Sequence, residues 1–181
     1  MNKERIILGI DPGTTIMGYG LINLIQKKVT IINFGIIELH KYSDHYLKLK
    51  KIFERTLQLI DEYHPDELAI EAPFYGKNVQ SMLKLGRAQG VAMSAALYRS
   101  IPIFEYAPRK VKLAITGVGS ASKEQVANFL KYLLKIDIPI HLDATDGLAV
   151  AVCHSMQNVG LQSSGAKSWK DFMNKNPGRI V

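Results

Sequence analysis

The first part of the chain alternates between short apolar runs and turn-forming residues. Residues 6–10 are a continuous apolar run that stops at Asp11-Pro12-Gly13, as is typical of a central strand buried on both faces. Residues 18–25 and 29–38 have the composition of two further strands, separated by a turn at residues 27–28. The pattern therefore predicts three consecutive strands that form a meander.

The remainder combines helical periodicity with two short strands. Apolar residues at helical spacing predict a helix over residues 44–63, ended by His64-Pro65. A strand over residues 67–71 closes on an acid, and a long helix over residues 78–99 is rich in glycine and alanine. The other expected elements are a strand at residues 101–106 and helices at residues 108–115, 122–135 and 143–156.

This order of elements predicts an α/β fold. A meander followed by alternating helices and strands gives a five-stranded mixed sheet with right-handed crossovers and helices on both faces. That layout is the ribonuclease H-like architecture. The length suits one domain, which we place at residues 1–158. We expect residues 159–181 to be a tail that is either loosely ordered or ordered by a partner, because this segment is rich in small polar and basic residues.

Composition favours a globular protein with a polyanionic partner. Lys and Arg number 23 against 16 Asp and Glu, an excess that suits nucleic acid or an anionic membrane surface. No apolar stretch is long enough for a signal-peptide core or a bilayer span, so we expect no membrane insertion. The single cysteine, Cys153, excludes an internal disulfide and suits a reducing compartment. These features predict a soluble, cytoplasmic protein.

Four acidic residues occupy positions from which they can converge. Asp11 and Glu71 each end an apolar strand, and the C-terminal ends of parallel strands form the usual site edge of an α/β sheet. Asp143 and Asp146 lie three residues apart at the start of a helix and share one face. Each acid also has a structural explanation, as a turn residue, a strand-end charge or a helix cap. Their common location at one sheet edge favours a functional site.

Such a cluster of carboxylates requires a cation. Two like charges about 4 Å apart repel by about 4 kcal/mol at an effective dielectric of about 20. Carboxylate oxygens suit Mg²⁺, with Mn²⁺ as a substitute. Two such ions roughly 3.5–4 Å apart can activate a water and stabilise a departing 3′ oxygen. The residues thus indicate a metal-dependent nuclease with two ions at its active site.

Several separate blocks of sequence resemble the RuvC family of Holliday junction resolvases. They occur in the family's order and spacing over about residues 5–158. The blocks are ILGIDPGT at 7–14, GYG at 18–20, AIE at 69–71 followed by Phe74, LKLGRAQG at 83–90, FEYAPRKVK at 104–112, GVGSASK at 117–123 and DATDGLA at 143–149. The resemblance implies a homodimeric, Mg²⁺-dependent crossover junction endodeoxyribonuclease. It implies that four-way DNA junctions are resolved by paired symmetric nicks, in recombination and repair, at short T-rich sequences. It further implies partnership with the branch-migration proteins RuvA and RuvB.

The resemblance also implies roles for individual residues. The positions that match the family's catalytic, metal-binding carboxylates are Asp11, Glu71, Asp143 and Asp146. Lys112 and Lys123 match catalytic basic residues near the scissile phosphate, with solvated helix charge as the alternative explanation. Phe74 matches an aromatic residue near the junction centre, and Tyr75 beside it competes for that stacking role; a core position is the alternative for either ring.

The helix at residues 78–99 connects the resemblance to DNA binding and dimerisation. Residues expected to extend the DNA surface on and before it are Lys77, Asn78, Lys84 and Arg87. Its small residues allow a second copy of the helix to approach about a two-fold axis, although packing on its own sheet explains them equally well. The chain departs from some family members at Asp146, where they have His, and in the Phe74-Tyr75 doublet.

Three other functions compete. Asp11-Pro12-Gly13-Thr14 resembles the phosphate hairpin of actin-like kinases and ATPases, but the chain has length for only one of their two domains. A non-catalytic nucleic-acid-binding module would not need all four acids. An RNA-cutting relative on the same scaffold would carry the same acids and basic groove.

Overall fold

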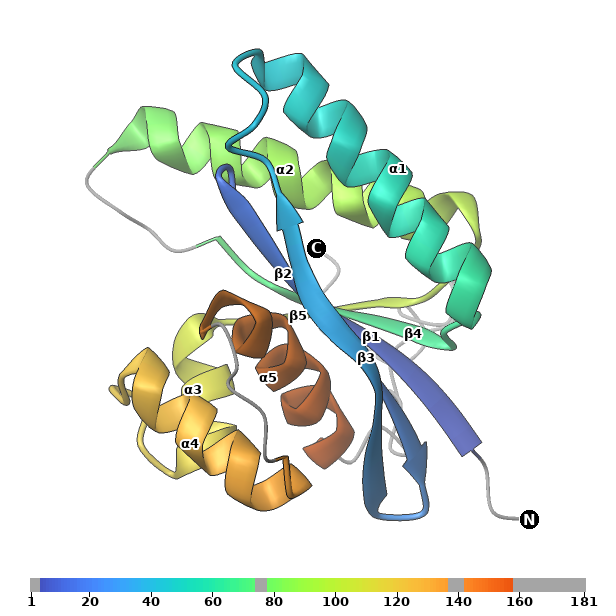
Figure 1. The fold of residues 1–181 in the computed structure, drawn as a ribbon, viewed down its shortest axis with the longest axis vertical. Coiled ribbons are helices and arrows are strands. Elements are labelled where there is room, and N and C mark those ends of the chain that lie inside the picture. Colours follow the sequence, from blue (N-terminus) through green and yellow to red (C-terminus); the bar gives the residue numbers. More distant parts are fainter. Residues whose placement is uncertain (1–3, 74–77, 137–141, 158–181) are drawn as a thin grey trace, which may run out of the picture.

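A five-stranded mixed sheet runs through the centre of the molecule, between two layers of helices (Figure 1). The computed structural model describes residues 4–73, 78–136 and 142–157. The strands are β1 (Glu4–Asp11), β2 (Ile16–Ile25), β3 (Lys28–Glu38), β4 (Glu67–Glu71) and β5 (Ile103–Tyr106). The helices are α1 (His45–Tyr63), α2 (Val79–Tyr98), α3 (Pro108–Thr116), α4 (Lys123–Leu134) and α5 (Leu142–Met156). The predicted ribonuclease H-like architecture, a five-stranded mixed sheet with helices on both faces, is confirmed.

The strand order is β3-β2-β1-β4-β5. The meander β1, β2 and β3 pairs antiparallel, whereas β4 and β5 add to the other side of β1 in parallel. Parallel neighbours need a crossover, and α1 and α2 are the helices that connect β3 to β4 and β4 to β5. The strand β1 is therefore central, which agrees with its continuous apolar sequence.

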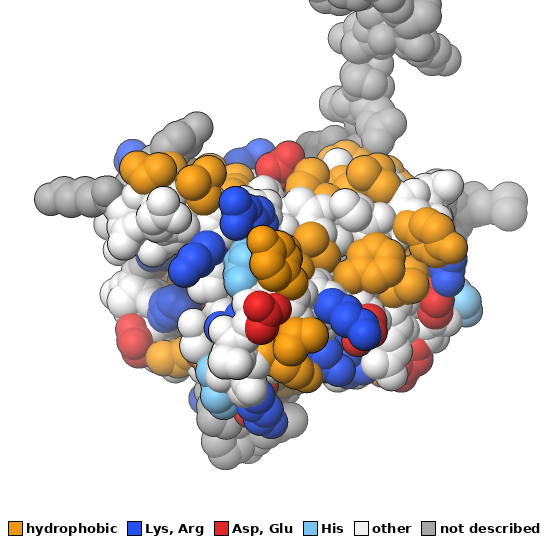
Figure 2. Space-filling view, turned by 90° about the horizontal axis from the view of Figure 1, so that it is seen from above, with side chains coloured by type: hydrophobic (Ala, Val, Ile, Leu, Met, Phe, Trp, Pro, Cys, Tyr) orange, Lys and Arg blue, Asp and Glu red, His pale blue; other side chains and the backbone are white. Residues whose placement is uncertain are grey.

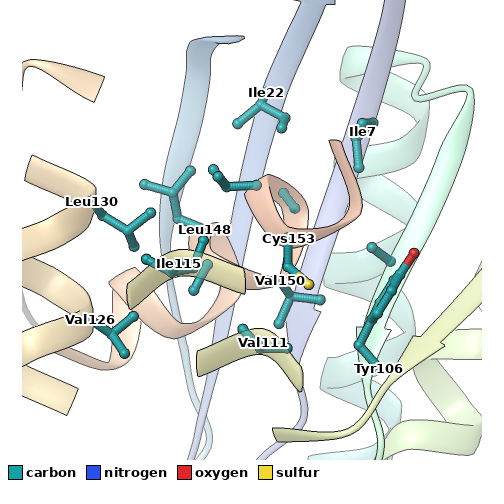
Figure 3. Packing of buried hydrophobic residues seen from close by; sticks show 14 of the residues in the cluster. Ile7, Ile22, Tyr106, Val111, Ile115, Val126, Leu130, Leu148, Val150 and Cys153 are labelled. Atoms are coloured by element: carbon teal, nitrogen blue, oxygen red, sulfur yellow. The ribbon is translucent and has the colours of Figure 1, made fainter. Parts of the chain in front are cut away.

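Side chains of β1 alternate between two hydrophobic cores. Ile7 belongs to the core beneath α3, α4 and α5. Leu8 and Ile10 belong to the core beneath α1 and α2. Figure 3 shows Ile7 and Ile22 of the sheet facing Leu148, Val150 and Cys153 of α5. Because α5 lies directly on the sheet, ten of the eleven residues from 144 to 154 are buried, and Asp146 is the exception.

Helix ends follow the signals in the sequence. Asp44 and Asn78 cap α1 and α2, each accepting a hydrogen bond from the backbone N–H three residues on. Ser122 and Gln125 form a complete capping box at the start of α4. The predicted boundaries are within two residues of those observed. At the start of β5 the two-residue difference has a clear cause, since the N–H of Ile101 bonds to the carbonyl oxygen of Ala96 in α2 and so lies outside the ladder.

Two further sequence predictions concern the C-terminal tail and membrane-spanning segments. The predicted tail at residues 159–181 lies outside the described residues. In the part of the chain that the structure describes, no helix is both long and apolar enough to cross a membrane.

Candidate active site

Asp11 and Glu71 are brought together by the parallel pairing of β1 with β4. Ile10 lies opposite Ile70 in this ladder, so the next residue of each strand is the acid that ends it. Neighbouring strands are about 4.8 Å apart, which places the two acidic residues side by side at the edge of the sheet. The strand-end prediction for these two residues therefore holds in the fold.

The start of α5 reaches the same edge because glycines let its backbone contact the sheet. A Cβ at Gly18 would lie 2.2 Å from the carbonyl oxygen of Asp143, and a Cβ at Gly147 would lie 2.5 Å from the backbone of Tyr19. Gly18 is also the residue of β2 that pairs with Asp11. The close packing of α5 on β2 thus carries Asp143 and Asp146 to the end of β1.

Burial and mutual repulsion change the pKa values of the acids. Burial, together with the charges of Asp146 and Asp143, raises the pKa of Asp11 from its ordinary value of 3.8 to about 7. Burial and the charges of Asp11 and Asp146 raise the pKa of Glu71 to about 8. Burial also raises the pKa of Asp146, against the opposing effect of Lys123. Without a further cation, the site cannot hold all these carboxylates ionised at neutral pH.

Lys123 is the basic residue in direct contact with the acids. Its Nζ lies 3.3 Å from Oδ1 of Asp143 and 2.5 Å from Oδ2 of Asp146. Although burial opposes its charge, the hydrogen bond and charge of Asp146 raise the pKa of Lys123. The capping box fixes the first turn of α4, from which this side chain extends. Lys123 is therefore more than a solvated helix charge.

Three of the four acids and both lysines line one cleft of about 1200 Å³. Its lining includes Asp11, Glu71, Asp146, Lys112 and Lys123. Lys112 extends from α3 and lowers the pKa of Glu71 against the larger effects of burial and Asp11. A second cleft, of about 1010 Å³, lies between the β2–β3 turn and the ends of α4 and α5, and no carboxylate is among its described lining residues. The first cleft is therefore the candidate active site.

The donor set suits a hard divalent cation. All the candidate ligands are carboxylate oxygens, partly or largely buried, and they repel one another. Among the residues that the structure describes, no three Asp, Glu, His or Cys side chains already surround one point as ligands. Lys123 instead contacts Asp143 and Asp146, so a cation would compete with its ammonium group for their oxygens. The residues fit a metal site whose carboxylate ligands would come together around the ion when it binds.

The other predicted DNA-binding residues lie elsewhere or outside the described residues. Lys84 and Arg87 are exposed on α2 and do not line the cleft. Asn78 is exposed, and its Oδ1 accepts a hydrogen bond from the Ser81 N–H at 3.1 Å, which gives it a capping role. Predictions for Phe74, Tyr75 and Lys77 fall on residues outside the described ranges.

Gln89 is a residue of the site that the sequence did not reveal. It is 7% exposed on α2, and its Nε2 donates to the carbonyl oxygen of Glu71 at 3.3 Å and to Oε2 of Glu105 at 3.0 Å. These bonds fix the ends of β4 and β5 relative to α2. A polar residue on the buried face of a helix rich in small residues was the available signal.

A buried polar network supports the sheet behind the site. His154 is fully buried, with Nδ1 2.6 Å from the hydroxyl of Tyr106 and Nε2 2.9 Å from Oε2 of Glu67. Glu67 in turn forms an ion pair with Arg5 at 3.2 Å. Burial lowers the pKa of His154 although Glu67 opposes this effect. The network joins α5 to β1, β4 and β5 and so fixes the helix that carries Asp143 and Asp146.

Comparisons with known proteins agree with this geometry. The family model described as "Crossover junction endodeoxyribonuclease RuvC" matches residues 7–154. A crossover junction endodeoxyribonuclease RuvC of Bacteroides fragilis is 62% identical, covering 98% of this chain and 97% of the relative. The same-named protein of Christiangramia forsetii is also 62% identical, over 99% and 95% of the two chains. The solved structure "T. thermophilus RuvC in complex with Holliday junction substrate" superposes with a TM-score of 0.76 at 27% identity, over 83% and 93% of the two chains.

Proposed function

Because the chain belongs to the RuvC family of crossover junction endodeoxyribonucleases, we propose that it resolves four-way DNA junctions by paired, metal-dependent nicks. One observation supports this most strongly. Asp11, Glu71 and Asp146 line one cleft with two lysines, and Asp143 contacts one of those lysines. The relative from T. thermophilus was solved with a Holliday junction substrate, and its fold is shared by this chain.

In this proposal Asp11, Glu71, Asp143 and Asp146 hold the metal, which is Mg²⁺, with Mn²⁺ able to substitute and two ions at each site. When bound, the cations supply Lewis-acid activation of water and neutralise charge at the scissile phosphate. The raised pKa values of Asp11 and Glu71 support this assignment, since an added positive charge would restore their ionised forms. The protein's own contribution is to fix these oxygens on two strands and one helix.

The two lysines act on the phosphate. Lys112 and Lys123 extend from α3 and α4 and line the cleft together with the acids that end β1 and β4. An ammonium group stabilises negative charge on the phosphoryl oxygens, which increases in the transition state. Lys123 contacts Asp143 and Asp146, two of the residues that would hold the metal, so its ammonium group lies close to the position expected for the scissile phosphate. The remaining basic residues on α2 and before it add salt-dependent affinity for the DNA backbone.

Two opposing nicks require two active sites, and α2 is the proposed homodimer interface. Ala88, Ala92 and Ala96 are buried against this subunit's own sheet. By contrast, a Cβ at Gly86 or Gly90 would meet nothing within 4 Å, so packing on the sheet does not explain these two glycines. Exposed apolar side chains continue along the helix, at 64% for Val79, 51% for Leu83, 64% for Leu97 and 66% for Tyr98. Figure 2, which views the molecule from the side on which α1 and α2 lie, shows apolar side chains interspersed with basic and acidic ones.

Sedimentation measurements test the interface. Gly90→Glu introduces a charge where two copies of α2 would approach, so we expect it to convert a dimer to a monomer that keeps its helix content in circular dichroism. Ser94→Glu, one turn further along, extends the test. A wild-type protein that sediments as a monomer at micromolar concentration would contradict the proposed dimer.

Comparison of substrates tests the proposed function. Wild-type protein with Mg²⁺ is given a four-way DNA junction, a linear duplex and an RNA–DNA hybrid, with Asp11→Asn as the inactive control. We expect symmetric nicks in two opposing strands of the junction and little cutting of the duplex. Preferential cutting of the hybrid would assign the chain to an RNA-cutting function instead.

Two further elements complete the proposal. Residues 1–158 form the nuclease domain, and a protein truncated after residue 158 should retain junction cutting. RuvA and RuvB are proposed as partners that present the junction, which pull-down on a preassembled RuvA–junction complex would test.

A further inference from the structure

The active-site cleft contains a third basic side chain, Arg109, to which the proposed function assigns no role. Arg109 lies in the first turn of α3 and lines the same cleft as Asp11, Glu71 and Lys112. Its guanidinium forms no ion pair and no side-chain hydrogen bond with any residue that the structure describes. Lys123, in contrast, is held by Asp143 and Asp146. An exposed, unpaired guanidinium in a cleft that accepts a polyanion is available for a ligand.

The stem of Arg109 is held in place by the loop that follows α3. A Cβ at Gly119 would lie 2.8 Å from Cγ of Arg109 and 3.1 Å from its Nε, so the side chain packs directly against the glycine backbone. Thr116 stabilises this loop, because its Oγ1 accepts a hydrogen bond from the Val118 N–H at 3.1 Å and lies 2.8 Å from the carbonyl oxygen of Lys112. The absence of a side chain at residue 119 therefore lets Arg109 lie along the cleft wall.

Arg109 and Lys112 both line the cleft from α3. Arg109 and Lys112 are three residues apart on α3 and share one face, with Cβ atoms about 5–6 Å apart. Successive phosphates of one strand are about 3.4 Å apart along the helix axis, so this spacing corresponds to one or two nucleotides.

We propose that Arg109, braced by Gly119, binds a backbone phosphate one or two nucleotides from the scissile phosphate on the cut strand. This inference rests on the proposed function and adds a second phosphate-binding position to the cleft. A guanidinium offers paired N–H donors to phosphate oxygens, and a fixed stem reduces the entropy lost on binding. The contact sets the register of the cut strand over the carboxylates rather than taking part in bond cleavage.

The experiment compares Arg109→Ala with Lys110→Ala. Lys110 is the adjacent residue of α3, equally charged and exposed, but its Nζ lies over the ring of Tyr106 at 5.0 Å and it does not line the cleft. For Arg109→Ala we expect junction binding weaker by on the order of tenfold and a salt slope smaller by about 0.9. Lys110→Ala should leave both close to wild type. Arg109→Lys should keep the slope while losing part of the affinity.

Two further experiments locate the contact between Arg109 and the phosphate. Gly119→Ala keeps every charge but displaces the Arg109 side chain, so it should weaken binding in the same direction while the protein keeps its melting temperature. Junctions with a neutral methylphosphonate at single positions within two nucleotides of the cut give a double-mutant cycle with Arg109→Ala. At one of these positions the wild type should lose affinity and the variant should not.

Each failure has a separate meaning. If wild-type protein neither binds nor cuts the junction, the proposed function fails. If the wild type cuts normally, two results overturn only the role of Arg109. In one, Arg109→Ala and Lys110→Ala bind the junction with the same affinity. In the other, the affinity lost in Arg109→Ala adds to the affinity lost with a neutral phosphate at every position tested.

Discussion

Replacement of Asp11 by asparagine should stabilise the metal-free protein while it abolishes cutting. Asp11 is largely buried beside other acids, and its pKa in the folded protein is about 7, against an ordinary value of 3.8. Between these pH values the folded state binds a proton that the unfolded state has lost. The free energy of unfolding therefore decreases as the pH rises from about 4 to about 7.

The size of the effect follows from that pKa difference. At about 1.36 kcal/mol for each pH unit, the ionised Asp11 costs up to ~4 kcal/mol of stability above pH 7. Asparagine keeps the shape and removes the charge, but it also removes an attraction to Lys123. We therefore expect Asp11→Asn to raise the free energy of unfolding at pH 8 by about 2–4 kcal/mol, or the melting temperature by roughly 5–15 °C.

The assay is thermal unfolding in EDTA from pH 4.5 to 8.5, with Glu54→Gln as the control. Glu54 is a half-exposed acid of α1, 3.7 Å from Lys50, and its replacement should change little. Mg²⁺ should then stabilise the wild type more than Asp11→Asn, because a ligand stabilises the state that binds it. The reasoning is refuted if Asp11→Asn melts at or below the wild-type temperature at pH 8, or if wild-type stability rises between pH 4.5 and 8.

Four further predictions address single residues. Lys123→Ala should slow single-turnover nicking on the order of 100-fold and weaken junction binding by less than about tenfold; the reverse ranking would limit Lys123 to backbone binding. Gln89→Leu should lower kcat by about tenfold with junction affinity unchanged, because the backbone of Glu71 loses a hydrogen bond; an unaltered kcat would remove its positioning role. Gly147→Ala should destabilise the protein by about 1–3 kcal/mol in denaturant unfolding, since its Cβ would lie 2.5 Å from the backbone of Tyr19; an unchanged midpoint would contradict the close packing. Phe74→Ala should slow junction cutting several-fold at an unchanged melting temperature, and an equal rate would end the stacking hypothesis.

The fold and the convergence of the acids were predictable because both depend on local patterns. A continuous apolar run predicted that β1 is central, and an acid at the end of each of two parallel strands predicted that Asp11 and Glu71 are adjacent. Asp143 and Asp146 required one more step, the packing of α5 on β2. Taken alone, the local sequence favoured helix capping over catalysis for these two acids. Asp146 lies in the second turn of α5 and forms an ion pair with Lys123 of α4, a contact that helix capping does not explain.

Contacts between distant elements were not predictable from the sequence. Gln89 reaches Glu71 and Glu105 across 18 and 16 residues, and His154 reaches Glu67 across 87. Each contact depends on one side chain with no periodic partner, so the local pattern does not identify the residue that it contacts. The contact of Arg109 with Gly119 is similar, because a glycine in a loop has many explanations until its neighbours are placed.

The central claim is that folding gathers carboxylates that need a divalent cation in order to cut DNA. Its most direct test is single-turnover cutting of a synthetic four-way junction, with Mg²⁺ and with EDTA, alongside a gel-shift measurement of binding. The account predicts paired nicks with Mg²⁺, none in EDTA although the junction remains bound, and none with Asp11→Asn under either condition. Equal cutting in EDTA, or normal cutting by Asp11→Asn, would contradict it.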